Sequence, residues 1–213
     1  APGFAALPGE PELFARRAEA RVGFPLFLKE DHSGSSLGVW RVADRRELLD
    51  LLRREKPAGP LVVEEALPGG EASVATLGGG GHPLRSLPPV EIVTRNPFFD
   101  YAAKYDPRIT DEYSPPRTIP MEMQERLGGL ARRVHRLLGC TGAARTDFIL
   151  APGGPVILEC NTIPGLTPES LLPKAARAAG IPFPRFVTLL VDMALGEGRP
   201  RREPRPRAAG EEG

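Results

Sequence analysis

The segment RTDFILAPGGPVILECNTIPG, residues 145–165, decides how this sequence folds and where its polar chemistry lies. Two short runs rich in β-forming residues, TDFIL and PVILEC, flank APGGP, whose proline and glycines are typical of a tight turn. We therefore expect a β-hairpin. Carboxylates interrupt both apolar runs, at Asp147 in the first and at Glu159 in the second.

The register of this hairpin determines whether its polar side chains meet. A hairpin centred on Gly153 places Asp147 opposite Glu159, and it also places Arg145 opposite Asn161. All four side chains then share one face, because side chains alternate along a strand with period two. Directly opposed residues have Cβ atoms about 4.5–5.5 Å apart, where two like charges destabilise the pair unless something neutralises them.

A divalent cation would neutralise the two carboxylates. Asp, Glu and Asn supply only oxygen ligands, which suit Mg²⁺ or Mn²⁺ rather than zinc. The alternative is a solvent-exposed face that carries an ordinary Arg–Asp ion pair. The residues alone leave both interpretations open.

Composition narrows the class of protein. The 213 residues are enough for one or two domains, and a net charge of +1 with 26% charged residues does not indicate a nucleic acid or a lipid surface as partner. No apolar run approaches the roughly 18 residues of a membrane span, and no signal sequence is evident. We expect a cytoplasmic enzyme acting on small molecules. Cys140 and Cys160 lack CxxC spacing, which predicts free core thiols in a reducing compartment.

The rest of the sequence predicts an alternation of helices and strands. Helices are expected over 11–22, 44–55 with Asp44 as N-cap, 121–140, 167–180 and 182–198. Strands are expected over 25–29, 39–42, 61–67, 72–79, 87–93 and 98–105, and a proline-rich loop over 106–120. The buried face of the 121–140 helix should carry Met123, Leu127, Leu130, Val134 and Leu137, which recur at helical spacing.

Lysine is rare in this chain, and one lysine directly precedes a flexible loop. The cations are nearly all Arg, with Lys only at positions 29, 56, 104 and 174. Lys29 ends an apolar strand before EDHSGSSLG, whose small residues would let backbone N–H groups approach a phosphate. An ordinary hairpin turn with a solvent-reaching Lys is the alternative.

Two further segments have both a functional and a plain interpretation. VVEEALPGGE, residues 62–71, could bind adenine at the strand end and ribose hydroxyls at Glu71, or it could carry solvated acids. In NTIPGLTPESLL, residues 161–172, Thr167 is the expected N-cap and Pro168 the first helical residue. The N–H groups of Ser170 and Leu171 would then be free to bind a carboxylate, with plain capping as the alternative.

Five segments in this order carry a family resemblance: PLFLKEDHSGSSLGV, VVEEALPGGE, FFDYAAKY, GAARTDFIL and ILECNTIPGLTPESLL. Together they closely resemble the D-alanine–D-alanine ligases of the ATP-grasp superfamily, from about residue 20 to 195. The resemblance implies an α+β ATP-grasp fold, in which two subdomains, residues 1–67 and 68–198, clasp the nucleotide ahead of a disordered tail, residues 199–213. It also implies cytoplasmic ligation of two D-alanines for peptidoglycan synthesis, with ATP and two Mg²⁺ or Mn²⁺ ions.

The resemblance implies a role for each candidate residue. The nucleotide-binding set is Lys29, Ser36, Glu64, Glu65, Leu67, Glu71 and Lys104. The metal-binding set is Asp147, Glu159 and Asn161. Ser35 would belong to the serine loop that covers the substrate, and Tyr105 to a second loop that closes over it. Arg145 and the Gly165 N–H would form the oxyanion site. Ser170 and Leu171 would bind the carboxylate of the second D-alanine.

The family's N-terminal domain, which contacts the first D-alanine, has no counterpart in this sequence. The chain starts at APGFAALPGEPE without Met, which is compatible with a fragment. We therefore expect the N-terminal domain either to be a separate partner or to be missing. A homodimer is also compatible with the sequence. Two alternatives remain: another ATP-grasp carboxylate–amine ligase, and a non-catalytic nucleotide-binding fragment.

Overall fold

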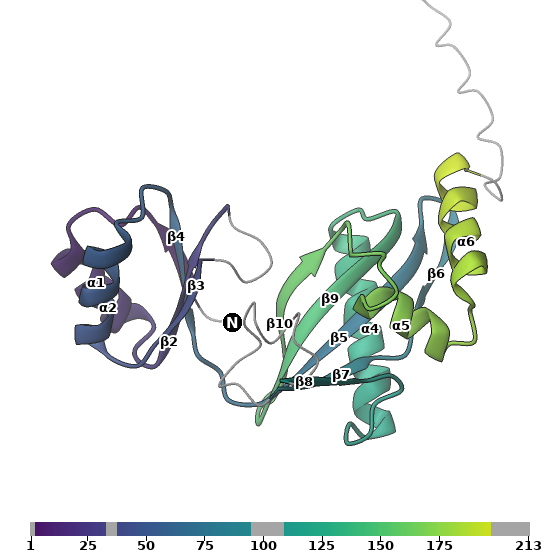
Figure 1. Cartoon of the computed structure of the whole chain (residues 1–213), viewed down its shortest axis with the longest axis horizontal. Coiled ribbons are helices and arrows are strands. Elements are labelled where there is room, and N and C mark those ends of the chain that lie inside the picture. The colour runs from purple at the N-terminus through teal and green to yellow at the C-terminus, as the bar shows by residue number, and fades with distance from the viewer. Residues whose placement is uncertain (1–2, 33–37, 95–108, 197–213) are drawn as a thin grey trace, which may run out of the picture.

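The computed structural model describes residues 3–32, 38–94 and 109–196, which form two units, each with its own β-sheet (Figure 1). The small unit contains β1 (Gly3–Ala6), α1 (Pro11–Arg21), β2 (Leu26–Glu30), β3 (Val39–Val42), α2 (Arg45–Glu55) and β4 (Leu61–Glu65). The large unit contains β5 (Gly70–Gly79), β6 (His82–Ser86), β7 (Val90–Thr94), β8 (Thr110–Tyr113), α4 (Met121–Leu137), β9 (Gly142–Ala151), β10 (Gly154–Asn161), α5 (Leu171–Ala178) and α6 (Phe183–Leu195).

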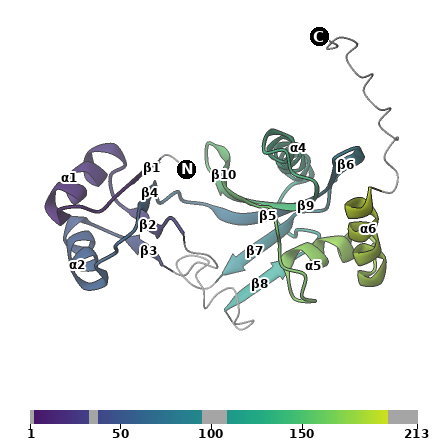
Figure 2. The same ribbon diagram turned by 90° about the horizontal axis from the view of Figure 1, so that it is seen from above.

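The small unit is an antiparallel sheet covered by helices on one face only. Its strand order is β1-β4-β2-β3, and α1 and α2 lie against the side that is remote from the large unit (Figure 1). Alternate residues of the central strands, such as Leu26, Leu28 and Val63, are buried in a core with Phe14 and Leu48 of the helices. Burying one such side chain contributes about 1.5–3 kcal/mol. The helix-free face is turned toward the large unit (Figure 2).

Helix α2 begins where the sequence predicts. The Asp44 side chain accepts a hydrogen bond from the Glu47 N–H at 2.9 Å, and Glu47 in turn accepts one from the Ala43 N–H at 2.7 Å. The first of these bonds satisfies a first-turn N–H that has no helical partner, and the second ties the residue before the N-cap to the helix. An N-cap of this kind typically stabilises a helix by about 1 kcal/mol.

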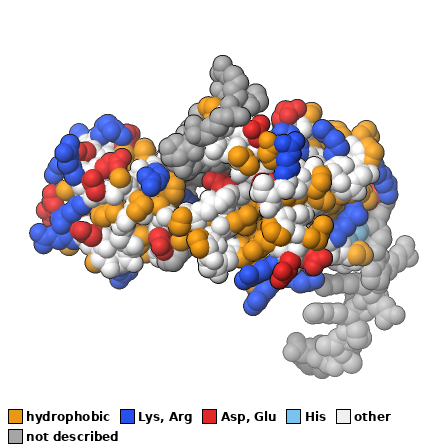
Figure 3. Space-filling model, turned by 90° about the horizontal axis from the view of Figure 1, so that it is seen from below, with side chains coloured by type: hydrophobic (Ala, Val, Ile, Leu, Met, Phe, Trp, Pro, Cys, Tyr) orange, Lys and Arg blue, Asp and Glu red, His pale blue; other side chains and the backbone are white. Residues whose placement is uncertain are grey.

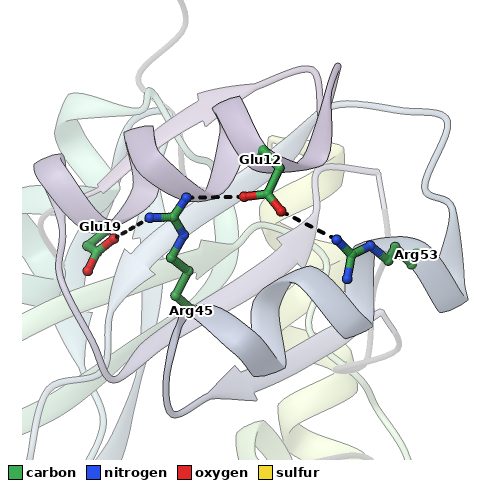
Figure 4. A network of polar contacts seen from close by, with 4 residues as sticks. All are labelled: Glu12, Glu19, Arg45 and Arg53. Atoms are coloured by element: carbon green, nitrogen blue, oxygen red, sulfur yellow. Dashed lines mark hydrogen bonds and ion pairs between the residues drawn. The ribbon is translucent and has the colours of Figure 1, made fainter.

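Helices α1 and α2 are joined across their exposed sides by a charged network (Figure 4). Arg45 lies 3.1 Å from Glu12 and 3.6 Å from Glu19, and Arg53 lies 3.4 Å from Glu12. Exposed pairs of this kind contribute only about 0–1 kcal/mol each, so the apolar core rather than this network holds the helices together. Basic and acidic side chains are interspersed over this unit (Figure 3), in keeping with the net charge of +1.

The large unit is an antiparallel sheet with helices on both faces. Its strand order is β10-β9-β5-β7-β8, with β6 paired to β5. Val74 of β5 packs with Leu127 of α4, whereas its neighbour Ala75 packs with Leu172 of α5. Because neighbouring residues of a strand point to opposite faces, α4 covers one face and α5 with α6 part of the other (Figure 2).

Several predictions about these elements were wrong. The expected loop 106–120 contains strand β8, and the sequence analysis missed β1 and β6. Helix α4 buries Leu127, Gly128, Ala131 and His135, whereas Leu137 is 75% exposed. The reason is close packing: a Cβ on Gly128 would lie 2.7 Å from Ser86 Oγ, so the helix approaches the sheet through its small residues.

The two cysteines and the apolar helices were also the subject of predictions from the sequence. Cys140 and Cys160 carry free thiols as expected, but each is half-buried rather than a core residue. Within the described ranges no single helix has the length and apolar character to cross a membrane, and the pair α5 with α6, which passes that test jointly, is bent by 107°. The predicted strand 98–105 and the predicted tail 199–213 lie outside the described residues.

Candidate active site

Strands β9 and β10 bring together the four polar residues of the predicted hairpin. Asp147 pairs with Glu159, and Arg145 pairs with Asn161, as the sequence predicts. Directly opposed residues of an antiparallel pair lie on the same side of the sheet, so the four side chains share one face, which we call the carboxylate face. It is the face that α5 and α6 cover at one end.

The predicted centre of the hairpin was nevertheless wrong, and an irregularity compensates for the error. Ala151 pairs with Gly154, so the turn consists of two residues and is not centred on Gly153. That register would place Leu158 opposite Asp147 and turn Glu159 to the other face. A β-bulge between Ile157 and Glu159 adds one unpaired residue and restores the pairing of the carboxylates.

Asp147 is held by donors from two strands. Arg145 Nε and Nη2 donate to its two carboxylate oxygens at 2.8 Å each, and Ser73 Oγ on β5 donates to Oδ1 at 2.5 Å. Burial by itself lowers the pKa of Arg145, but the hydrogen bonds and charge of Asp147, with the charges of Glu159 and Glu112, outweigh it and raise that pKa. Arg145 is therefore a fixed cation.

The carboxylate face fits a hard divalent cation whose coordination is completed by other groups. Asp147 and Glu159 offer carboxylate oxygens, and Asn161, whose Oδ1 accepts a hydrogen bond from the Ile163 N–H at 3.0 Å, lies two residues beyond Glu159. In the part of the chain that the structure describes, no three His, Cys, Asp or Glu side chains cluster as a metal site. A cation here would thus need further oxygens, such as those of a phosphate.

The loop after β10 starts its helix later than predicted. Helix α5 begins at Leu171 with Ser170 as N-cap, so Thr167 is not the N-cap and Pro168 is not helical. The Ser170 N–H is not free, because it donates to the Thr167 carbonyl at 2.9 Å. The Leu171 N–H stands in the first turn, where helices have no internal acceptor, and the Ser170 hydroxyl lies 2.8 Å from that of Thr167.

Gly165 and Ser170 lie against each other although they come from different parts of this loop. A Cβ on Gly165 would lie 2.7 Å from Ser170 Oγ, so only glycine allows this approach without displacement. The backbone of Gly165 therefore lies against the start of α5, in the loop that follows Asn161, the last residue of β10. This contact brings the predicted oxyanion residue close to a predicted substrate residue.

The candidate nucleotide residues come from both units. Lys29 and Glu64 form an ion pair on the helix-free face of the small sheet. Glu65 is exposed and Leu67 half-buried where the chain leaves that sheet. On the large sheet Glu71 pairs with Ile149, which puts it on the same face as Asp147.

Four of the candidate residues from the sequence lie outside the residues that the structure describes. They are Ser35, Ser36, Lys104 and Tyr105. The structure also adds polar residues near the carboxylate face that the sequence analysis did not name as candidates: Ser73, which bonds Asp147, and Glu112, which bonds Lys174. Their partners lie 74 and 62 residues away in sequence, so no local motif indicates them. Lys174 had one sequence signal, its rarity among the cations.

The chain matches a known family over most of its length. A family profile described as the C-terminus of D-Ala–D-Ala ligase matches residues 6–192. The chain is 43% identical over 183 residues to a D-alanine–D-alanine ligase of Desulforudis audaxviator, and 40% identical over 181 residues to one of Moorella thermoacetica. These alignments cover 84% and 82% of this chain but 58% and 56% of the relatives. The chain thus spans a little over half the length of these curated relatives.

Solved structures give the same result. A D-alanine–D-alanine ligase from Bacillus anthracis superposes with a TM-score of 0.73 at 32% identity, covering 91% of this chain and 61% of that protein. The VanG D-Ala:D-Ser ligase from Enterococcus faecalis superposes with a TM-score of 0.77 at 30% identity, covering 90% of this chain and 55% of that protein. The ATP-grasp fold expected from the sequence is confirmed.

Proposed function

The chain belongs to the D-alanine–D-alanine ligase family, and we propose that it forms the ATP-binding and acceptor-binding part of an enzyme that joins two D-alanines. The observation that carries this proposal is the carboxylate face, where Asp147 and Glu159 oppose each other beside the half-buried cation Arg145. The dipeptide would serve peptidoglycan synthesis in the cytoplasm. The small unit and the large unit would be the two subdomains, residues 1–67 and 68–198.

The nucleotide would lie between the two sheets. Lys29, on the helix-free face of the small sheet, would bind phosphate, with Lys104 as a second phosphate ligand and Ser36 in the covering loop. Glu64, Glu65 and Leu67 would line the adenine, and Glu71 would bind the ribose hydroxyls. This arrangement is supported by Lys29 and Glu64, which lie on the helix-free face of the small sheet, and by Glu71, which lies on the carboxylate face of the large sheet. The helix-free face is turned toward the large unit (Figure 2).

Asp147, Glu159 and Asn161 would hold two Mg²⁺ or Mn²⁺ ions, which neutralise the phosphate charge that develops during phosphoryl transfer. Ser73 and Arg145 orient the Asp147 carboxylate through their hydrogen bonds. Lys29 would supply positive charge from the opposite unit.

Peptide bond formation would proceed through an acyl phosphate. The carboxylate of the first D-alanine would attack the γ-phosphorus of ATP and displace ADP, which gives the acyl phosphate. The amine of the second D-alanine would then attack the acyl carbon, expel phosphate and lose its proton to solvent. Arg145 and the Gly165 N–H would stabilise the oxyanion of that tetrahedral intermediate, while Ser170 and Leu171 bind the carboxylate of the second D-alanine. Ser35 and Tyr105 would cover the substrates. Loss of one oxyanion donor typically lowers the rate about 10² to 10³-fold.

The first D-alanine would be held by a separate domain. The curated relatives are nearly twice as long as the matched region, and we place the first-substrate site in the part of those relatives that this sequence does not match. Positioning of reactants supplies about 7–11 kcal/mol of barrier reduction. The 213-residue chain should therefore bind Mg²⁺–nucleotide weakly and make no dipeptide alone.

A second candidate function is ligation of D-alanine to D-serine. It is suggested by the similarity to the VanG D-Ala:D-Ser ligase, a solved relative whose name specifies a different acceptor. The two activities share the ATP chemistry and differ in the acceptor. Product analysis with D-alanine, D-serine and D-lactate separates them.

The test supplies the chain with the N-terminal part of the Desulforudis audaxviator relative, fused or in trans, and measures phosphate release and dipeptide formation. The expected result is ATP-dependent D-alanyl-D-alanine synthesis that neither half shows alone. Nucleotide binding with no phosphate release under all acceptors would instead indicate a non-catalytic fragment. Dipeptide synthesis by the purified chain alone, at the rate of a full-length relative, would overturn the need for a separate domain.

A further inference from the structure

Lys174 connects helix α5 to the edge of the large sheet. Its Nζ lies 2.8 Å from Glu112 Oε2 on β8 and 3.2 Å from Glu169 Oε2 in the loop before the helix. The Glu112 side chain is only 14% exposed, whereas that of Glu169 is 86% exposed. The pair with Glu112 is therefore shielded from solvent and holds the ammonium, while the contact with Glu169 is a surface contact worth little.

The helix that Lys174 anchors has weak means of fixing its own start. Helix α5 has eight residues, and its N-cap Ser170 makes no side-chain capping hydrogen bond. Helices of this length are marginal in isolation, so contacts with the rest of the protein set their position. Leu172 of this helix packs in an apolar core with Ile92 of the sheet. This apolar contact holds the helix against the sheet, but it does not fix the orientation of the helix. The ion pair adds a directional contact, because it joins two defined atoms.

Glu112, the partner of Lys174, lies on the same face of the large sheet as Asp147. Glu112 pairs with Ile92, which is two residues from Val90, the partner of Ser73, so it belongs to the carboxylate face. The Lys174 ammonium, 2.8 Å from Glu112 Oε2, balances the charge of that carboxylate on the face where Arg145 bonds Asp147.

We propose that Lys174 is a positioning residue for the acceptor amino acid: by holding Glu112 it fixes the Ser170 hydroxyl and the Leu171 N–H relative to Arg145. The proposal rests on the proposed function, because it assumes that the start of α5 binds the carboxylate of the second substrate. It adds a residue that need not touch that substrate. A displacement of about 1 Å at such a site is enough to lower the rate about a hundredfold.

Three variants separate positioning from general stability. Lys174→Met keeps a long apolar stem and removes the charge, and Lys174→Arg keeps the charge. Arg177→Met is the matched control, because Arg177 is an exposed cation on the same helix. It donates a hydrogen bond to the Pro168 carbonyl at 3.5 Å. The first measurement is amide hydrogen exchange at Ala175 and Ala176 in the full chain, because these are the first amides of α5 after the variant position that have acceptors within the helix. Lys174→Met should exchange about tenfold faster than wild type, and the other two variants should not, because local opening controls exchange.

The second measurement is a titration of the Mg²⁺–nucleotide-loaded chain with D-alanine, followed by the amide NMR signals of Ser170 and Leu171. Wild type and Lys174→Arg should respond alike, and Lys174→Met should need about tenfold more D-alanine, which corresponds to about 1.4 kcal/mol. In the complemented enzyme the KM for the acceptor should rise by the same factor, with the KM for ATP within about twofold of wild type.

The outcomes distinguish this proposal from the function on which it rests. If wild type responds to D-alanine and Lys174→Met responds equally, the positioning role is wrong while the proposed function stands. If wild type shows no response at Ser170 and Leu171, the proposed function of α5 is wrong and the positioning role is overturned with it. Should Lys174→Met fail to fold, Glu112→Gln removes the same ion pair from the strand, and it must then reproduce the loss of D-alanine binding.

Discussion

Arg145 and Asp147, two residues apart on strand β9, form a two-pronged ion pair in which both guanidinium-to-carboxylate hydrogen bonds are 2.8 Å long. Alternate residues of a strand point to the same face, so this contact follows directly from the spacing in the sequence. Glu159, on the opposite strand, forms no ion pair with an arginine among the residues that the structure describes. A cation at this face would therefore find one carboxylate oriented by the protein and one available to it.

Removing either opposed carboxylate should abolish Mg²⁺-dependent nucleotide binding and leave the fold intact. Asp147→Asn and Glu159→Gln each lower the negative charge of the site, and each also relieves repulsion between the two carboxylates. Calorimetric titration with Mg²⁺ and an ATP analogue measures the effect, with the exposed Glu125→Gln on α4 as control. Unchanged affinity in both variants would rule out the metal assignment.

Replacing Arg145 by lysine should separate binding from chemistry. Lysine keeps the positive charge but cannot reproduce the planar fork that holds Asp147, so the donor that we propose for the oxyanion would be misplaced. In the complemented ligase the turnover rate should fall about 10² to 10³-fold. The apparent affinity for nucleotide should change far less, and an equal loss in both quantities would argue that Arg145 acts on binding alone.

Substituting Gly165 should disturb the acceptor site. In Gly165→Ala the new methyl group would lie 2.7 Å from Ser170 Oγ and displace that hydroxyl. We expect a higher KM for the acceptor D-alanine with the KM for ATP unchanged. Gly129→Ala is the matched control, because a Cβ there meets no atom within 4 Å and alanine favours the helix by about 1 kcal/mol. Identical kinetics for Gly165→Ala and wild type would contradict this geometry.

His135 should make the chain less stable in weak acid. Its ring is 1% exposed, Nδ1 lies 2.9 Å from Thr76 Oγ1, and burial lowers its pKa below the usual 6.5. Below pH 6.5 the unfolded chain binds this proton more readily than the folded one, so the stability present above pH 6.5 is lost as the pH falls through the lowered pKa. Urea midpoints across this range should show the slope, and His135→Gln should flatten it.

Glu91 should anchor the segment between β8 and α4. Its carboxylate is 5% exposed and accepts hydrogen bonds from the N–H groups of Arg117 at 2.7 Å and Thr118 at 3.0 Å, and from the Thr118 hydroxyl. Burial alone would raise the pKa of Glu91, but these hydrogen bonds outweigh it and lower the pKa. Its stabilising effect is thus present above pH 4.5 and lost as the pH falls through the lowered value.

The variant Glu91→Gln tests this anchor at neutral pH. Hydrogen bonds to a charged group are worth about 1.5–3 kcal/mol, so we expect the free energy of unfolding in urea to drop by about that amount. The exposed Glu122→Gln in the first turn of α4 serves as control. A drop no larger than in the control would mean that the segment is held by its other contacts.

Much of the fold could be predicted because it depends on local signals. The strands of the β9–β10 hairpin follow from their composition, and helix α2 follows from Asp44 and the apolar spacing behind it. The start of α5 could not be fixed in this way. Thr167 and Ser170 both have a hydroxyl side chain that can cap a helix, and Pro168 favours a start at Thr167. The helix starts after Ser170 instead, because residues 167–170 form a turn in which the Ser170 N–H bonds the Thr167 carbonyl.

The polar contacts that complete the site depend on the packing of distant segments. Ser73 was placed in a strand, but nothing in its neighbourhood indicates that it faces Asp147. Strand β8 was hidden among prolines, so Glu112 could not be matched with Lys174. Both contacts arise from how the sheet is assembled, which periodicity within one segment does not report.

The bulge at Leu158 determines which changes in chain length this site tolerates. In a regular antiparallel ladder the loss of one residue reverses every side chain beyond it. Here the loss of Leu158 would leave Ile157 opposite Phe148 and Glu159 opposite Asp147, as they are now, because the deleted residue has no partner in the ladder. A single-residue deletion at this position should thus be neutral for the alignment of the carboxylates, whereas the same deletion at Cys160, one residue beyond Glu159, would move Asn161 to the wrong face.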